Sequence, residues 1–98
     1  MQIKTVGIAG TMESSDIVVR VEPNPENGIV VHLESAVIRQ YGNQIKRVIN
    51  DTLISLGINS AIVSAVDKGA LDCTVAARTS AAAYRAAECE NYKWGGGK

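Results

Sequence analysis

Residues 17–33, IVVRVEPNPENGIVVHL, contain two strand patterns separated by a turn. The first six residues alternate, with Ile17, Val19 and Val21 on one side, which predicts a half-buried strand over residues 17–22. A cluster of proline, asparagine and glycine at 23–28 predicts a turn, and residues 29–33 predict another strand. Residues 3–11 predict an earlier strand whose glycines indicate a bulge or a close backbone approach. The first third of the chain is therefore predicted to be an antiparallel meander.

The hydrophobic period then changes from 2 to 3.6, which predicts an amphipathic helix over residues 37–56. The apolar stripe of this helix consists of Val37, Tyr41, Ile45, Val48, Ile49, Thr52, Leu53 and Leu56. Residues 61–66 predict a further strand, and an alanine-rich segment at about 70–87 predicts a second helix that can lie close to a neighbour. The order βββαβα predicts an α+β fold, a small and mostly antiparallel sheet with two helices packed on one face.

Length and composition narrow the class of protein. The 98 residues predict a single domain over 1–98, with a loose tail at about 91–98. Ten basic and ten acidic residues give zero net charge, which argues against a nucleic-acid binder, as does the aromatic content of 4%. Neither a signal peptide nor a membrane span is recognisable. The expectation is a soluble cytoplasmic protein with no membrane partner.

Few residues are of the types that carry catalysis or bind metals. His32 is the only histidine, and its place in a strand pattern predicts a structural or surface residue rather than a base. Cys73 and Cys89 lack zinc or redox spacing; Cys73 is predicted to lie in the core and Cys89 to be semi-exposed. No nucleophile with its base can be assembled. The sequence therefore predicts no catalytic residue and no metal site.

Two polar segments remain. Residues 67–69, DKG, either bind an anion before a helix or, the favoured interpretation, form with Asp72 a solvated capping turn. Residues 10–16, GTMESSD, place two hydroxyls between two carboxylates at the tip of a predicted hairpin. This is either an ordinary turn or a modification site, because an exposed serine on a turn held by two strands suits a large swinging group. Periodicity alone leaves both interpretations open.

Residues 10–16, GTMESSD, and residues 66–73, VDKGALDC, followed by Arg78, resemble the two markers of the citrate lyase acyl carrier protein (gamma subunit) family. The resemblance covers nearly the whole chain, and length and motif order match. It implies that Ser14 carries 2′-(5″-phosphoribosyl)-3′-dephospho-coenzyme A through a phosphodiester, attached by a prosthetic-group transferase. It also implies a non-catalytic cytoplasmic phosphoprotein of citrate fermentation. This carrier presents acetyl and citryl thioesters to an alpha (transferase) and a beta (lyase) subunit, and citrate is cleaved to acetate and oxaloacetate.

On this interpretation Glu13 and Asp16 repel the phosphodiester, so we expect them to guide the transferase or to keep the turn solvated. The alternatives are the acyl carrier subunit of malonate decarboxylase and an unmodified α+β interaction module in which Ser14→Ala is silent. A small enzyme relying on Cys73, Cys89 or His32 is the weakest. The helical phosphopantetheine carrier is disfavoured, because this chain is neutral, is predicted to be rich in strands and lacks the Asp-Ser-Leu tripeptide.

Overall fold

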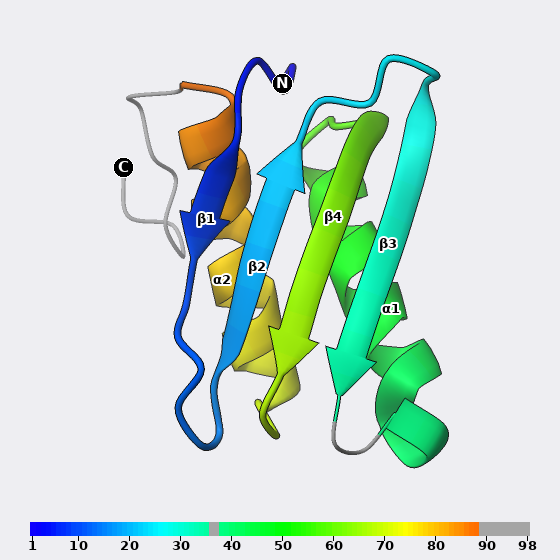
Figure 1. Cartoon of the computed structure of the whole chain (residues 1–98). Coiled ribbons are helices and arrows are strands. Elements are labelled where there is room, and N and C mark those ends of the chain that lie inside the picture. Colours follow the sequence, from blue (N-terminus) through cyan, green and yellow to red (C-terminus); the bar gives the residue numbers. More distant parts are fainter. Residues whose placement is uncertain (36–37, 89–98) are drawn as a thin grey trace.

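The computed structural model describes residues 1–35 and 38–88 of the chain. Its elements are β1 (Gly7–Ala9), β2 (Ile17–Glu22), β3 (Gly28–Ser35), α1 (Ile38–Ser55), β4 (Ser60–Asp67) and α2 (Asp72–Ala86). Figure 1 shows two layers, with both helices behind one face of a four-stranded sheet. The predicted α+β class, the order βββαβα and the packing of two helices on one face are confirmed.

The strands are arranged in the order β1-β2-β4-β3. β1 pairs with β2 and β2 with β4 in antiparallel fashion, whereas β3 runs parallel to β4. The sheet is therefore mostly antiparallel, as predicted, but the three-strand meander is wrong because β4 lies between β2 and β3. Alternation identifies the buried side of a strand and not its neighbour. The turn over residues 23–27 steps across β4, two strand spacings or about 10 Å.

The core lies between the sheet and the helices. The helix-facing residues Ile17, Val19 and Val21 of β2 are completely buried, and on α1 Ile45 and Ile49 face them from the predicted stripe. The helix predicted over residues 37–56 is confirmed as α1, which ends at Ser55, one residue before the predicted end; Val37 lies outside the described residues. Burial of such side chains stabilises the fold by about 25 cal/mol per Å² of apolar surface.

Glycine and alanine bring β1 into close contact with α2. A Cβ atom on Gly7 would collide with the backbone of Ala82 and Ala86, so the close approach predicted for this segment is confirmed. The amides of Lys4 and Thr5 both donate to the carbonyl of Ala86 at 2.9 Å. The strand predicted over residues 3–11 is accordingly limited to Gly7–Ala9, because the preceding backbone bonds to the end of α2 instead of to β2.

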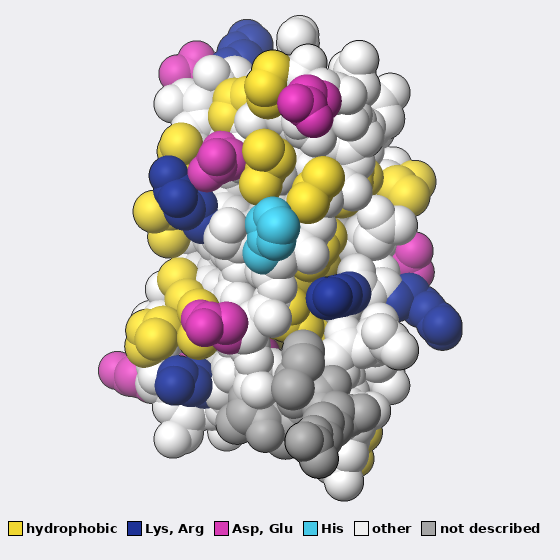
Figure 2. Space-filling model, turned by 45° about the vertical axis from the view of Figure 1, so that its right-hand side comes forward, with side chains coloured by type: hydrophobic (Ala, Val, Ile, Leu, Met, Phe, Trp, Pro, Cys, Tyr) yellow, Lys and Arg dark blue, Asp and Glu magenta, His cyan; other side chains and the backbone are white. Residues whose placement is uncertain are grey.

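The face of the sheet away from the helices is open to solvent. Ile8, Arg20, Ser64 and His32 lie in one row across the four strands, and the side chain of His32 is exposed, as predicted. Figure 2, which brings the β3 side of the molecule forward, shows hydrophobic, acidic and basic side chains interspersed there. No single sign of charge dominates this surface.

Candidate functional site

The two polar segments singled out in the sequence lie side by side at one end of the sheet. One is the β1–β2 turn, residues 10–16, and the other is the β4–α2 loop, residues 68–71. Both connections lie at the same end of the strands (Figure 1). The amide of Ser15 donates to the carbonyl of Lys68 at 2.8 Å, and the amide of Lys68 donates to the carbonyl of Asp16 at 2.8 Å. β1 and β2 form the predicted hairpin, and its tip is tied to the second motif by two backbone hydrogen bonds.

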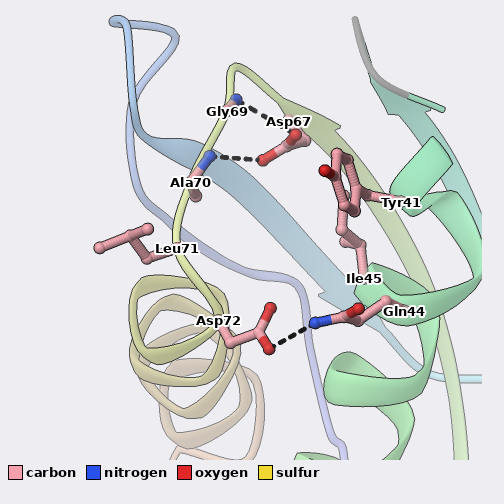
Figure 3. A pocket seen from close by; sticks show the side chains of 8 residues that line it. All are labelled: Tyr41, Gln44, Ile45, Asp67, Gly69, Ala70, Leu71 and Asp72. Carbon is pink, nitrogen blue, oxygen red and sulfur yellow. Dashed lines mark hydrogen bonds between the residues drawn. The ribbon is translucent and has the colours of Figure 1, made fainter.

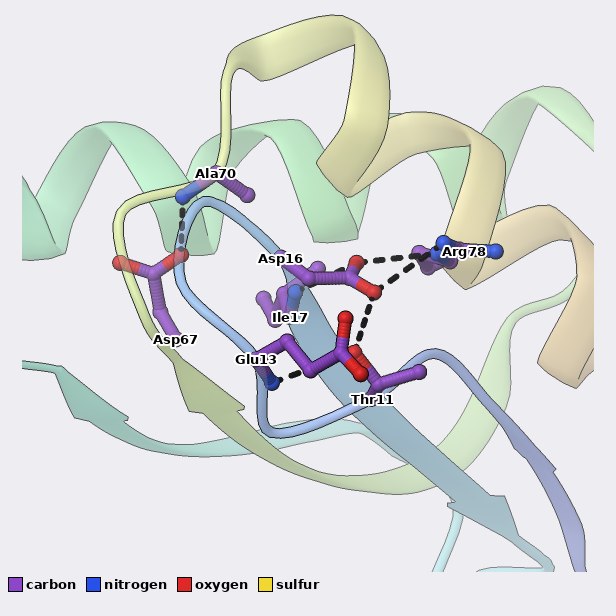
Figure 4. Close-up of polar contacts among 7 residues, drawn as sticks. All are labelled: Thr11, Glu13, Asp16, Ile17, Asp67, Ala70 and Arg78. Carbon is purple, nitrogen blue, oxygen red and sulfur yellow. Dashed lines mark hydrogen bonds and ion pairs between the residues drawn. The ribbon is translucent and has the colours of Figure 1, made fainter.

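Asp16 is the anchor of the β1–β2 turn. Its carboxylate accepts hydrogen bonds from Nε and Nη2 of Arg78 at 3.0 and 3.1 Å, in the two-point geometry that arginine makes with carboxylates (Figure 4). It also accepts the Thr11 hydroxyl and the Ile17 amide, each at 2.7 Å. These donors favour the charged form, Arg78 most strongly and Thr11 and Ile17 after it. They hold the pKa of Asp16 well below its usual range, although burial opposes them.

This arrangement corrects the expectation for Asp16. Its side chain is nearly buried and ion-paired, so it neither keeps the turn solvated nor presents a free charge to another enzyme. Arg78 lies on α2, far along the chain from the turn, and reasoning from periodicity did not find its role. The only signal for it was its position after the second motif in the family resemblance.

Ser14 is exposed at the tip of the turn. Within residues 1–35 and 38–88, no hydrogen bond joins its hydroxyl to another group. The backbone on both sides is held: Thr11 Oγ1 accepts the amide of Glu13 at 3.2 Å, and the carbonyl of Glu13 accepts the amide of Asp16 at 3.2 Å. The site therefore combines a free, accessible hydroxyl with a fixed backbone. Ser15 is also exposed, but it adopts φ = 66°.

The second motif forms a capped turn. The carboxylate of Asp67 accepts the Ser35 hydroxyl at 2.9 Å and the amides of Gly69 and Ala70 at 3.1 and 3.0 Å. The predicted capping role is thus confirmed, but Asp67 is buried rather than solvated, whereas Lys68 and Asp72 are exposed. Because a buried carboxylate occupies the loop amides, this loop is not built to hold an anion with its backbone.

The remaining candidates do not join this site. Cys73 is exposed on the first turn of α2, so the prediction of a core residue is wrong; the buried face of that helix contains Val75 and Thr79 instead. Cys89 and the predicted tail at about 91–98 lie outside the described residues.

In the described ranges no group of three or more histidine, cysteine or acidic side chains is placed to hold a metal ion. No helix of that part of the chain is long and apolar enough to cross a membrane.

Known proteins resemble the chain over almost all of its length. A family model described as "ACP: Malonate decarboxylase delta subunit" matches residues 4–86. The citrate lyase acyl carrier protein of Streptococcus equi subsp. zooepidemicus is 52% identical over 94 residues, which cover 96% of this chain and 92% of the relative. The protein of the same name from Streptococcus mutans is 55% identical over the same shares. No solved structure matches. The chain belongs to the family of citrate lyase acyl carrier proteins.

Proposed function

We propose that this chain is the acyl carrier subunit of citrate lyase and that Ser14 is the residue to which its prosthetic group is attached. One observation carries the proposal: an exposed hydroxyl without a hydrogen-bond partner in the described part of the chain stands on a turn fixed by distant segments. The names of the relatives and their identity of 50–55% support the acyl carrier role. The resemblance of residues 10–16 to the family motif supports Ser14 over Ser15.

The residues around Ser14 fit a phosphodiester-linked group. Two carboxylates flank the serines in sequence, which at first argues against an added negative charge. In the structure the carboxylate of Asp16 is neutralised by Arg78, and Lys68, whose backbone contacts Ser15, is exposed beside the turn. Only Glu13 remains as an unpaired acid of the turn within the described residues. The local charge therefore tolerates 2′-(5″-phosphoribosyl)-3′-dephospho-coenzyme A on Ser14.

The protein itself supplies position and not catalysis. The prosthetic group supplies a thiol that holds acetyl and citryl thioesters during the cleavage of citrate to acetate and oxaloacetate. Asp16 is a poor base toward the Ser14 hydroxyl because its pKa is lowered and its oxygens are engaged. We therefore assign activation of the hydroxyl to a prosthetic-group transferase. There Ser14 Oγ displaces the leaving group of a phosphoric anhydride donor and gives its proton to the transferase.

A fixed attachment point matters because the carrier serves several partners. We propose that these are the alpha (transferase) and beta (lyase) subunits of citrate lyase, in the cytoplasm of a citrate-fermenting cell. A tethered thioester is present at each partner's active site at raised effective concentration. This advantage is greatest when the residue that holds the tether is fixed relative to the rest of the carrier. The contacts of Asp16, Arg78 and Lys68 meet this requirement at the turn.

The test is the intact mass of the protein purified from cells that ferment citrate, followed by mapping of the modified peptide. We expect an increment equal to the prosthetic group minus one water on the peptide containing Ser14. Ser14→Ala should remain unmodified with an unchanged circular dichroism spectrum, and the matched control Ser15→Ala should be modified like the parent chain. An unmodified parent chain, or modification retained in Ser14→Ala, would contradict the proposal.

A second candidate is the acyl carrier subunit of malonate decarboxylase, because the description of the matching family model bears that name. Both candidates use a carrier serine, so the mass increment does not separate them. Co-purification from the host does: citrate lyase subunits bound to the tagged chain support the first candidate, and malonate decarboxylase subunits support the second. If Ser14→Ala leaves both activities unchanged, the unmodified interaction module becomes the better interpretation.

A further inference from the structure

A cleft of about 510 Å³ lies between the start of α1 and the β4–α2 loop. Tyr41 and Ile45 of α1 face Ala70 of the loop across it (Figure 3). Its volume falls within the range of small-ligand sites, about 300–1,000 Å³. Tyr41 belongs to the predicted core stripe of α1, yet it is 52% exposed. An aromatic ring is therefore presented to solvent at the side of an apolar cleft.

The cleft lies next to the β1–β2 turn, which contains Ser14. Lys68, whose carbonyl accepts the amide of Ser15, lies in the chain between Asp67 and Gly69, which both line the cleft. Ser14 neighbours Ser15 in the chain, Ser15 is hydrogen-bonded to Lys68, and Lys68 neighbours Gly69 at the rim. Since neighbouring Cα atoms are 3.8 Å apart, these steps place Ser14 on the order of 10 Å from the rim of the cleft. A substituent on Ser14 that spans about 10 Å would reach the rim of the cleft.

The polar groups of the cleft select against anions. Asp67 and Asp72 contribute carboxylates, and Gln44 donates its amide to Asp72 at 2.7 Å. Among the described lining residues there is no lysine or arginine. Such a lining repels phosphate and the carboxylates of a citryl group. It suits a flat, uncharged ring that stacks on a tyrosine and offers N–H donors to a carboxylate.

We propose that this cleft is the resting site of the adenine base of the prosthetic group on Ser14. The inference rests on the proposed function. In that group the ribosyl phosphate joins the protein to the nucleoside, so adenosine lies close to Ser14 and the thiol at the far end. Adenine is the part that is within reach, flat and uncharged, and it carries an amino N–H for Asp72.

Binding of the adenine in the cleft shortens the part of the prosthetic group that remains mobile. The nucleoside rests against α1 and the β4–α2 loop, while the acyl end remains free to reach other subunits. This raises the effective concentration of the thioester around the carrier, because the free arm is shorter. The cleft therefore extends the fixed platform from the serine to the nucleoside.

The test is nuclear magnetic resonance on the holo protein, after its mass has shown the group on Ser14. We expect nuclear Overhauser contacts from adenine H2 or H8 to the Tyr41 ring, and shifts of the Gly69 and Ala70 amides between apo and holo protein. Tyr41→Ala should lose these contacts and shift changes while keeping the mass increment. The matched control Ile54→Ala, which replaces another exposed residue of α1, should keep them.

The outcomes separate the two proposals. Loading on Ser14 with a freely tumbling adenine that contacts no cleft residue would overturn the cleft assignment alone. Contacts of Tyr41 with the pantetheine end instead of the base would also overturn it. A chain isolated without the group from citrate-fermenting cells would overturn the proposed function and this inference together.

Discussion

The two turns at opposite ends of β2 are held in different ways. The β1–β2 turn, residues 10–16, is tied to α2 through Arg78 and to the β4–α2 loop through Lys68. The β2–β3 turn, residues 23–27, is held mainly by the side chain of Asn24, whose Nδ2 donates to the carbonyls of Asn27 and Gly28 and whose Oδ1 accepts the backbone amide of Glu26. The first turn is bonded to two distant segments, whereas the second has one hydrogen bond to a distant strand, from the Ser60 hydroxyl to the carbonyl of Asn24 at 3.0 Å, and is otherwise held by local contacts.

The difference bears on the proposed attachment of a group to Ser14. A local turn satisfies its own polar groups but moves with its two strands. The β1–β2 turn instead gains contacts from segments far along the chain, and these fix where Ser14 stands relative to α2 and the cleft.

Alanine at Gly10, in the first turn, and at Gly28, which directly follows the second, should give the largest difference in stability. Gly10 and Gly28 both adopt positive φ, 96° and 93°, but a Cβ on Gly10 would collide with the carbonyl of Ile17, whereas a Cβ on Gly28 meets nothing within 4 Å. We expect Gly10→Ala to lower the free energy of unfolding by about 3 kcal/mol or more, and Gly28→Ala by about 1–2 kcal/mol. Urea unfolding measures both; equal losses would contradict the comparison.

Arg78→Gln should loosen the first turn only. It removes the charged donors of Asp16, so the amides of Ser15 and Ile17 should exchange with solvent about tenfold faster. The amides of Glu26 and Asn27 should be unaffected. Asn24→Ala is the reciprocal variant and should accelerate only the second turn. Hydrogen exchange measured residue by residue distinguishes them, and faster exchange in both turns of Arg78→Gln would show that the ion pair supports the whole fold instead.

Acid should remove the stability that Asp16 contributes through the first turn. The pKa of Asp16 is lower in the folded than in the unfolded chain. Its contribution to stability is therefore complete above the unfolded value, about 4, and is lost as the pH falls through the folded value. We expect the free energy of unfolding to decline below pH 4 and Asp16→Asn to show a shallower decline. Unfolding curves between pH 2.5 and 7 test this, and parallel curves for the two proteins would refute it.

The smallest effect is expected for Thr11→Val. It removes the hydroxyl that donates to Asp16 and accepts from the amide of Glu13, while Arg78 remains in place. The expected loss is about 1 kcal/mol. Thr5→Val, at an exposed threonine outside the turn, is the matched control and should be neutral. Equal unfolding midpoints in urea for the two variants would mean that the Thr11 hydroxyl adds nothing to the turn.

Local patterns predicted much of this molecule. The alternation at Ile17, Val19 and Val21 identified the buried face of β2, and the helical spacing through Ile45 and Ile49 identified that of α1. These signals are local because each side chain's direction follows from its own backbone conformation. Cys73 was misplaced because an alanine-rich helix has few large apolar side chains to mark its buried side.

Local sequence patterns were sufficient for the order of the elements, for the buried faces of β2 and α1 and, through two motifs, for the carrier family and the expectation for Ser14. Three features became visible only in the folded chain: β4 lies between β2 and β3, Arg78 neutralises Asp16, and a cleft lined by Tyr41 and by residues of the β4–α2 loop is present. The two groups of features differ in the sequence separation of the contacts that produce them. Periodicity records how each residue is oriented within its own element, whereas strand neighbours, ion pairs and clefts arise from contacts between distant segments, selected by the packing of the whole chain.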